Sequence, residues 1–300
     1  MKVAAYQCPL LPSGSMDAIE CDPRPTPASA RSRSTCWSFP RRSGSVTRQP
    51  RISAGLDRDS IPEHAVIVWL ASYPRSGNTF LRIVLHRVYG VPTYSVYQDD
   101  DPVAQRVGPV LVGYRPRPAD RAIMAGDAEV YFVKTHKRRK ADGYPAICLV
   151  RDGRDAVVSA ARLRATAVPA PGDDRALFEQ LLREEITRPY VAGQPSSGGW
   201  GGNVLSWLNS GRTPLAILRY EDLVVDPRGA TARAVLSLLP DLVPVVDACI
   251  PSFDELHGID PEFFRRGVAR SCRDEMPDEL HELFWAQPAN AVAMRRLGYV

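Results

Sequence analysis

Blocks of apolar residues separated by polar turns run through the chain from residue 66 onward, and the first block sets the pattern. Val66 to Leu70 is an apolar, largely β-branched run, which predicts a strand buried on both faces. The run ends before Pro74, and the chain turns at Ser76-Gly77. Apolar residues then recur at helical spacing, at Leu81, Val84, Leu85 and Val88. Strand, small-residue turn and helix in this order place free backbone N–H groups and the positive end of a helix at one point, which suits an anion.

The rest of the chain alternates predicted strands with predicted helices. We expect further strands over residues 130–133, 146–150 and 214–218. We expect helices over residues 154–165, 173–190, 227–239, 245–250 and 278–286, and a short helix that runs through Trp207. Residues 93–128 are predicted as a long loop with one short helix, and residues 196–203 as a flexible loop. This alternation predicts an α/β fold with a parallel sheet covered by helices on both faces.

The first 64 residues follow neither pattern. Arginine, proline and serine are mixed over residues 21–64 without a period of 2 or 3.6, so this segment buries too little apolar surface to offset its ordering entropy. We therefore expect residues 1–64 to be a disordered extension and residues 65–300 to form one domain. Residues 1–20 resemble the opening strand and loop of carbon–nitrogen hydrolases, and nothing after them continues that pattern. A basic tail that binds a polyanion is the alternative function for the extension.

Composition and charge exclude several classes of function. Of the 300 residues, 44% are hydrophobic, which can supply a sizeable core. The apolar run from Ala65 to Ala71 is too short to span a bilayer, and residues 1–20 lack the pattern of a signal peptide, so we expect no membrane span. Residues 1–64 carry nine Lys and Arg against six Asp and Glu, and the remainder 29 against 28, so we expect no nucleic-acid-binding surface on the domain.

The cysteines are scattered along the chain without a Cys-x-x-Cys pair. They are Cys8, Cys21, Cys36, Cys148, Cys249 and Cys272. This spacing argues against a zinc site and against a disulfide framework, and it favours a cytoplasmic protein.

Polar or charged side chains follow the predicted strands where each strand ends. They are Arg75, Lys134, His136, Arg151 and Tyr220. Because ligands of an open α/β sheet bind beyond the carboxyl ends of the strands, we expect these side chains to converge. Three of the five are cationic, so the expected ligand is an anion with more than one phosphate-like group. His136 alone among them can move a proton near neutral pH.

In this arrangement the chain resembles PAPS-dependent sulfotransferases over residues 66–300, where PAPS is 3′-phosphoadenosine 5′-phosphosulfate. The segment from Tyr73 to Phe80 is similar to the family's loop for the 5′-phosphosulfate, and it lacks the Gly-x-x-x-x-Gly-Lys pattern of a Walker A loop. Six further matches follow in family order: Lys134-Thr135-His136, Arg151 with Ser159, Trp200 with Trp207, Tyr220-Glu221-Asp222, Ser252-Phe253, and residues 263–267. The resemblance implies a three-layer, P-loop-like sulfotransferase fold.

The resemblance also implies the roles of the site residues. His136 would be the general base, and Lys134 and Arg75 would neutralise charge on the transferred group and the leaving oxygen. The other implied contacts are to PAPS, as co-substrate without a metal. Ser76, Gly77, Asn78 and Thr79 would hold its 5′-phosphate, Phe80 and Tyr220 would contact adenine, and Arg151, Ser159, Ser252, Arg265, Arg266 and Gly267 would hold its 3′-phosphate.

The chain departs from the family pattern at several positions. Arg75 stands where the family usually has Lys, and Phe80 stands where it usually has the Trp that stacks on adenine. Arg270 and Cys272 replace a usual Gly and Trp, so we expect a weaker closure over the 3′-phosphate. The dimer-forming C-terminal motif of animal cytosolic members is not visible, which leaves the oligomeric state open.

Two other functions are compatible with a strand–loop–helix phosphate site. A nucleotide-dependent kinase would need a metal-holding carboxylate at a second strand end, for which Asp152 and Asp222 are the candidates. A catalytically inactive protein that binds PAPS or its product PAP is the other alternative.

The acceptor pocket is expected to come from loops whose sequences do not name a molecule. These loops are residues 93–128 and 164–200, and we expect a small-molecule alcohol or phenol as acceptor. The basic run Lys137 to Lys140 is expected to be a solvated loop, with an acidic acceptor as the alternative. We expect Trp200 and Trp207 to pack in the core rather than to contact a ligand. The remaining histidines, His64, His86, His257 and His281, are expected to be structural.

Overall fold

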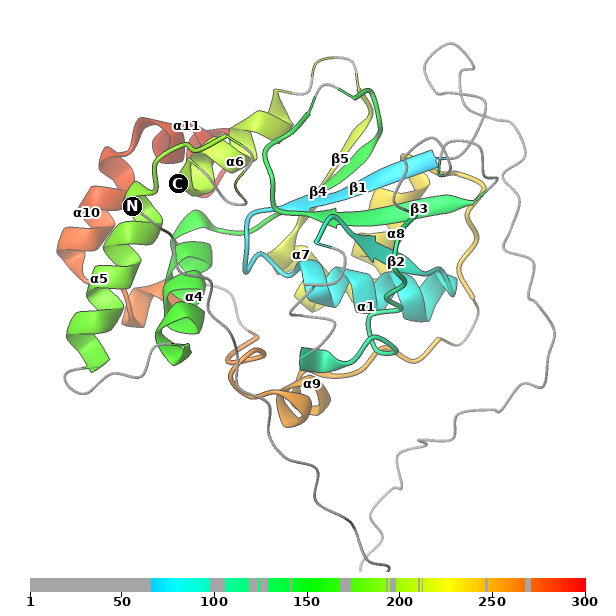
Figure 1. Cartoon of the computed structure of the whole chain (residues 1–300), viewed down its shortest axis with the longest axis horizontal. Helices are drawn as coiled ribbons and strands as arrows, with labels where there is room; N and C mark the ends of the chain where they lie inside the picture. Colours follow the sequence, from blue (N-terminus) through cyan, green and yellow to red (C-terminus); the bar gives the residue numbers. More distant parts are fainter. Residues whose placement is uncertain are drawn as a thin grey trace, which may run out of the picture. The chain divides into compact units, whose positions relative to one another are not determined.

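β1 (Val66–Ser72) lies in the middle of a five-stranded sheet within the described part of the chain (Figure 1). The strand order is β2-β3-β1-β4-β5, and every neighbouring pair is parallel. The other strands are β2 (Thr93–Ser95), β3 (Val130–Thr135), β4 (Ala146–Val150) and β5 (Leu215–Arg219). The structure, a computed structural model, describes residues 66–97, 106–118, 124, 129–140, 142–167, 174–192, 194, 198–209, 211, 213–245, 248–267 and 271–300.

The apolar run of β1 serves two cores, one on each face of the sheet. Ile67, Trp69 and Ala71 pack in one core, and Val68 and Leu70 pack in the other. Alternation of the side chains across a strand explains this division, because both faces of a central parallel strand are covered. The predicted α/β fold with a doubly covered parallel sheet is therefore confirmed.

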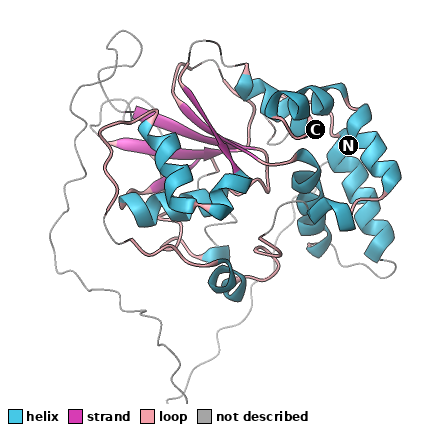
Figure 2. Cartoon of the chain, turned by 180° about the vertical axis from the view of Figure 1, so that it is seen from behind, coloured by secondary structure: helices cyan, strands magenta, loops and turns pink. Residues whose placement is uncertain are grey.

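Helices form the outer layers on the two faces. One core contains side chains of α1 (Asn78–Tyr89) and α8 (Pro227–Leu236). The other core contains side chains of α4 (Gly153–Thr166), α5 (Asp174–Thr187), α6 (Gly199–Leu208), α10 (Asp278–Ala286) and α11 (Pro288–Leu297). Figure 2 shows the same arrangement from behind, with the second group gathered beside one end of the strands. Three short helices complete the described part: α7 (Tyr220–Val225), α9 (Phe253–Ile259) and the 3₁₀ turn η2 (Ser271–Asp274).

The predicted strands and most predicted helices are confirmed within a few residues, but β2 was missed. Residues 93–128 were expected to form a loop, yet Thr93–Ser95 pairs in parallel with β3. Its residues are polar and nevertheless buried, because the hydroxyl of Thr93 accepts from Arg82 Nε at 3.0 Å and donates to the carbonyl of Val112 at 2.6 Å. A strand stabilised by such long-range hydrogen bonds has no apolar run to indicate it.

One predicted helix is wrong, and other helical segments were not predicted. The helix expected over residues 245–250 is wrong, because Val245 and residues 248–250 are not helical and the next helix, α9, begins at Phe253. The glycine-rich loop expected over 196–203 is helical from Gly199. The helix that ends at Ala286 is followed by a further helix, α11, in which Pro288 occupies a first-turn position that needs no N–H donor.

The predictions for residues 1–64 lie outside the described residues. The extension, its alternative role and the hydrolase-like opening therefore stay predictions. In the described part of the chain, no helix has the length and apolarity that crossing a membrane requires.

The glycines of α6 permit a close contact with α11. A Cβ on Gly201 would lie 2.3–2.4 Å from backbone atoms of Ala289 and Asn290, and the Gly201 N–H donates to Asn290 Oδ1 at 2.9 Å. Real Cβ atoms do not approach backbone so closely, so a side chain at this position would separate the two helices.

We expect Gly201→Ala to lower the free energy of unfolding by about 1–3 kcal/mol, because α11 must move away from α6. Gly258→Ala is the matched control, since Gly258 is also helical and a Cβ there would meet nothing within 4 Å. This control should be neutral or stabilising by roughly 0.5 kcal/mol. Urea unfolding followed by circular dichroism measures both variants. Equal stabilities of the two would contradict the close α6–α11 contact.

Candidate functional site

Five strand-end side chains meet at one cavity of about 820 Å³. Arg75 follows β1, Lys134 and His136 lie at the end of β3, Arg151 follows β4, and Tyr220 follows β5. All five line the cavity. The parallel strands bring these residues together, as expected, because their carboxyl ends lie along one edge of the sheet.

The turn after β1 is built on two left-handed residues. Arg75 has φ 64° and Gly77, the residue before α1, has φ 96°. A Cβ on Gly77 would lie 2.6 Å from Cδ2 of Tyr220, so glycine is required here both by its φ and by the closeness of the tyrosine ring. The turn brings the N-terminus of α1 to the cavity, where Gly77, Asn78, Thr79 and Phe80 form part of the wall. The first N–H groups of a helix have no partner within the helix, so this wall favours an anion.

Ser76 is the one predicted site residue that is absent from the cavity lining. Its side chain is 1% exposed, and its hydroxyl has no hydrogen-bond partner among the described residues. A buried hydroxyl without a partner is uncommon in proteins. The loop therefore retains one unused polar group next to the N-terminus of α1.

His136 is held from three sides. Its Nδ1 lies 3.0 Å from the carbonyl oxygen of Ser72 and 3.2 Å from the hydroxyl of the same residue. Its backbone N–H donates to the Tyr97 hydroxyl at 3.0 Å, and its carbonyl accepts from Asn203 Nδ2 at 2.8 Å. Because a carbonyl oxygen can only accept, Nδ1 carries the proton of the neutral ring, and Nε2 is left as the acceptor nitrogen. A neutral Nε2 on a side chain that lines a cavity can act as a general base.

Two further residues, Asn78 and Tyr97, support this histidine. Asn78, at the start of α1, donates through Nδ2 to the hydroxyl of Ser72 at 3.1 Å and to the carbonyl of Leu70 at 2.9 Å. Lys134 is 3% exposed, and its Nζ lies 5.8 Å from the centre of the Tyr97 ring. Tyr97 therefore lies against Lys134 in β3 and against His136, which follows that strand. Sequence reasoning missed it, because nothing in the polar segment around it distinguishes it from a loop tyrosine.

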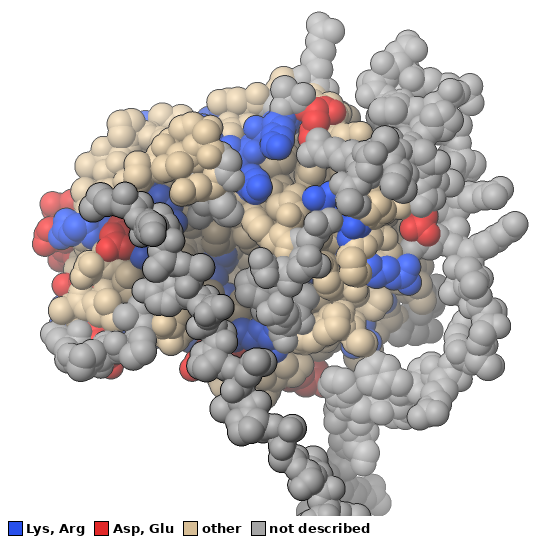
Figure 3. Space-filling view, in the orientation of Figure 1, with Lys and Arg blue, Asp and Glu red and all other residues tan. Residues whose placement is uncertain are grey.

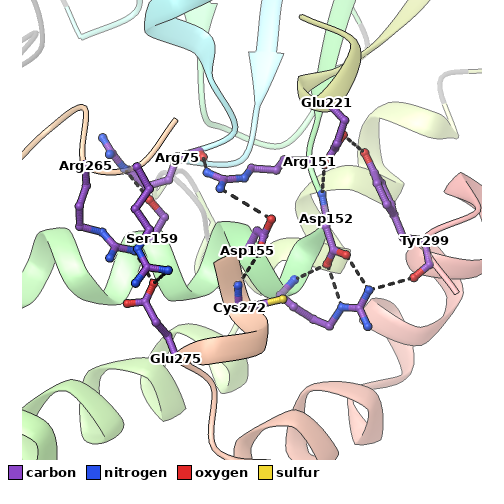
Figure 4. Close-up of polar contacts among 12 residues, drawn as sticks. Arg75, Arg151, Asp152, Asp155, Ser159, Glu221, Arg265, Cys272, Glu275 and Tyr299 are labelled. Carbon is purple, nitrogen blue, oxygen red and sulfur yellow. Dashed lines mark hydrogen bonds and ion pairs between the residues drawn. The ribbon is translucent and has the colours of Figure 1, made fainter. Parts of the chain in front are cut away.

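Arg75 points toward the side of the cavity formed by α4 and residues 263–267 (Figure 4). Its Nε donates to the Ser159 hydroxyl at 3.2 Å, its terminal nitrogen donates to the Phe263 carbonyl, and its guanidinium lies 4.3 Å from the centre of the Phe263 ring. Burial and the neighbouring charge of Arg151 lower the pKa of Arg75 to about 10. Arg75 therefore remains a cation at neutral pH, in surroundings where an anion would be favourable.

Arg151 adds a second guanidinium to the same wall. It donates to the backbone carbonyl of Arg75 at 3.1 Å and lies 4.4 Å from the centre of the Tyr220 ring. Its counterion is Asp155, at 3.7 Å, whose carboxylate also accepts from the backbone N–H of Cys272 at 2.8 Å. Burial and the charge of Asp155 raise the pKa of the Cys272 thiol to about 12, so Cys272 fills space in place of the usual Trp without becoming reactive.

The late motif residues reach the cavity, but their side chains already have protein partners. Arg265 and Arg266 line the cavity and pair with Glu275, at 2.7 and 3.4 Å. Gly267 lines it with φ 62°, where a Cβ would clash with the Phe253 ring. Ser252 also lines the cavity, but its hydroxyl caps α9 in a reciprocal pair with Glu255.

The tryptophans pack in the core, as expected. Trp200 is 1% exposed, its ring centre lies 6.0 Å from that of Phe284, and it closely approaches Gly153. Trp207 is buried and donates from Nε1 to the Lys137 carbonyl at 3.1 Å. Neither lines the cavity.

Sequence reasoning missed most of the apolar wall of the cavity. The missed residues share only apolar character and come from separate segments: Leu163, Val224, Ile250 and Leu256. The space-filling view of one face shows Lys and Arg side chains in its central part and Asp and Glu mostly toward its margins (Figure 3). The residues that line the cavity combine cationic side chains with an apolar wall, which suits an anion that also carries an apolar ring.

Comparison with known proteins gives a family match and more distant relatives. A family model described as "Sulfotransferase domain" matches residues 67–235. A WSCD family member of Drosophila melanogaster is 28% identical over 177 residues, which cover 58% of this chain and 49% of that protein. A relative from Drosophila pseudoobscura pseudoobscura is 27% identical over 184 residues, with coverages of 60% and 52%. The chain spans about half the length of these relatives.

A solved structure with a similar fold is that of mouse sulfotransferase SULT7A1 complexed with PAP. The TM-score is 0.51 at 18% sequence identity, and the match covers 78% of this chain and 89% of that one. This likeness concerns the fold.

We expect the neutral ring of His136 to carry its proton on Nδ1, because that nitrogen faces the Ser72 carbonyl. Two-dimensional ¹H–¹⁵N spectra of the imidazole nitrogens at neutral to alkaline pH distinguish the two tautomers. The chain has five histidines, and loss of one signal set in His136→Gln assigns the ring. A ring protonated on Nε2 would contradict the general-base geometry.

Proposed function

Because this chain belongs to the sulfotransferase domain family, we propose that it transfers a sulfuryl group from PAPS to a hydroxyl of a small-molecule acceptor. The products would be a sulfate ester and PAP. The observation that carries the proposal is that His136, with an acceptor Nε2, lines the same cavity as Lys134, Arg75 and Arg151. A base, a set of cations and a helix N-terminus in one cavity are the groups that transfer of an anionic group to a hydroxyl requires.

The residues present fit a nucleotide with two anionic ends. The N-terminus of α1 and the unpartnered hydroxyl of Ser76 would receive the 5′-phosphosulfate. Arg151, Ser159 and Arg265 line the same cavity and would receive the 3′-phosphate. Phe80 and Tyr220 line the cavity with the apolar wall and would contact adenine. A cavity of about 820 Å³ is within the usual range for a site of this kind.

The reaction would be an in-line displacement at sulfur. His136 Nε2 would take the proton of the acceptor hydroxyl as the oxygen forms its bond to sulfur, while the bond from sulfur to the 5′-phosphate oxygen breaks. Lys134 and Arg75 would neutralise charge on the sulfuryl oxygens and on the phosphate that leaves with PAP. The Arg75 guanidinium now contacts Ser159 and the Phe263 carbonyl, so the phosphosulfate would have to compete with that carbonyl for it.

The kinase alternative finds less support in the two candidate carboxylates. Asp152 caps α4 by accepting from the backbone of Arg154, and both its oxygens also accept from the Arg154 side chain, at 2.9 and 2.6 Å. Its backbone N–H donates to Glu221, and Asp222 is exposed on α7. Neither aspartate lines the cavity. Among the described residues, no group of three or more His, Cys, Asp or Glu side chains is placed to hold a metal ion.

We expect His136→Ala to lower kcat by about 10²–10⁴-fold, because the base is lost, and to change the Kd for PAP by less than about threefold. Turnover of PAPS with a panel of alcohols, phenols and sugars measures the first quantity, and calorimetric titration with PAP measures the second. His281→Ala is the matched control, because His281 lies on α10 and contacts Trp285 outside the cavity.

The turnover and binding measurements distinguish three possibilities. Wild-type protein that binds PAP but turns over no acceptor in the panel would support the inactive binding protein. Unchanged kcat in His136→Ala would remove the histidine from the mechanism. Failure of the wild-type protein to bind PAP would reject the proposed function.

Chelation distinguishes sulfuryl transfer from phosphoryl transfer. We expect an excess of EDTA to leave PAPS-dependent turnover unchanged, because the cations of the proposed site are side chains. A kinase would lose its activity, since Mg²⁺ neutralises the nucleotide phosphates there. Turnover of ATP that stops on chelation and returns with added Mg²⁺ would favour the kinase.

A further inference from the structure

Glu275 is a buried carboxylate that joins three arginines, of which Figure 4 labels Arg265. It follows η2, and its side chain is 6% exposed. Oε1 accepts from the terminal nitrogen of Arg265 at 2.7 Å and lies 3.4 Å from that of Arg266, while Oε2 accepts from Arg162 Nε at 2.9 Å. Burial opposes its ionisation, but the hydrogen bonds and charges of the arginines outweigh burial and lower the pKa of Glu275. The carboxylate is therefore ionised at neutral pH.

The three arginines come from two separate parts of the chain. Arg162 lies on α4, one turn beyond Ser159, and its guanidinium stacks 3.6 Å from the centre of the Phe178 ring. Arg265 and Arg266 belong to the segment of the cavity wall that follows α9. The carboxylate of Glu275 thus fixes this segment to α4, the helix that also carries Ser159 and Asp155.

Electrostatics explains why these arginines need a shared carboxylate. Three guanidinium groups share the one buried carboxylate of Glu275, and Arg266 also lies 3.7 Å from the exposed Asp274. Positive charge still exceeds negative charge here, and Arg75 and Arg151 add to it nearby. The side chains of Arg162, Arg265 and Arg266 are 38%, 30% and 40% exposed, so each can turn into water. With Glu275 ionised, the arginines have a common anchor, and their orientation is set before any ligand arrives.

We propose that Glu275 is a positioning residue that holds Arg265 and Arg266 at the cavity wall and thereby sets the preference for nucleotides with a 3′-phosphate. The proposal rests on the proposed function, because the ligand is a 3′-phosphorylated adenosine nucleotide. Glu275 would act on the ligand only by orienting Arg265 and Arg266, so its own side chain takes no part in sulfuryl transfer.

The test compares binding of PAP with binding of AMP, which lacks the 3′-phosphate. We expect Glu275→Gln to weaken PAP binding by about tenfold and AMP binding by less than about twofold, because the released arginines act on the 3′-phosphate alone. In turnover, the KM for PAPS should rise by a similar factor, whereas kcat at saturation stays within about twofold. Glu275→Asp, which keeps the charge on a shorter side chain, should fall between wild type and Glu275→Gln.

Glu279→Gln is the matched control. It removes the same charge from an ion pair with Arg183 at 2.6 Å on exposed surface of α5 and α10, where the Glu279 side chain is 76% exposed. It should leave the ratio of the two dissociation constants unchanged. Calorimetric titrations on the full chain, with circular dichroism to verify folding, give these ratios.

Each outcome of the titrations either supports or overturns the proposed role of Glu275. A folded Glu275→Gln with the wild-type ratio of AMP to PAP dissociation constants overturns the proposal, and so does tighter PAP binding, which would make Glu275 a competitor of the phosphate. If Glu275→Gln does not fold, Glu275→Asp carries the test, and a wild-type ratio in that variant overturns the proposal. Wild-type protein that binds neither nucleotide instead rejects the proposed function.

Discussion

The site depends on keeping two guanidinium groups, those of Arg75 and Arg151, close together at the carboxyl edge of the sheet. Arg151 donates to the backbone carbonyl of Arg75, and burial together with the charge of Arg151 lowers the pKa of Arg75. Asp155 lies behind Arg151, and the Phe263 carbonyl and ring lie against Arg75, so each cation is partly compensated by a different element. The remaining excess of positive charge is what an anionic ligand would neutralise. The fold thus maintains an arrangement that is unfavourable by itself and favourable once an anion binds.

The strand order accounts for most of what the sequence could predict. In the sheet β3, β1, β4 and β5 are neighbours, so the residues at their ends lie in the order Lys134, Arg75, Arg151 and Tyr220 along one edge. Apolar runs and the turn at Gly77 indicate these strands, and parallel strands share the edge at which they end. The convergence of distant residues was therefore predictable from local patterns and one topological rule. The core positions of Trp200 and Trp207 were also predicted, because tryptophans in a helix more often pack in a core than contact a ligand.

The features that escaped prediction depend on contacts between segments far apart in the chain. β2 is three polar residues held by Arg82 and the Val112 carbonyl, neither of which a local pattern reveals. Tyr97 acquires its place from the backbone of His136, 39 residues away. Glu275 is one of many acidic residues, and only the fold shows that three arginines surround it. A single charged or hydroxyl-bearing residue belongs to no repeating pattern of apolar positions. The sequence therefore does not indicate whether its side chain is buried.

The two sides of the cavity are held by different forces. His136 and Lys134 lie on or beside β3, where ladder hydrogen bonds and apolar packing on both faces fix the backbone. The opposite wall, residues 253–267, is held by side chains: Arg106 pairs with Asp260 at 3.0 Å, Arg75 with the Phe263 carbonyl, and Arg265 with Glu275. In α9 only Leu256 is buried. Leu256, Phe263 and Phe264 also pack in a small apolar cluster with Ile83 and Val112. This cluster is much smaller than the two cores of the sheet, so we infer that this wall is the less stable side. The base and Lys134 are therefore fixed by the sheet, and the arginines depend on their polar partners for their position.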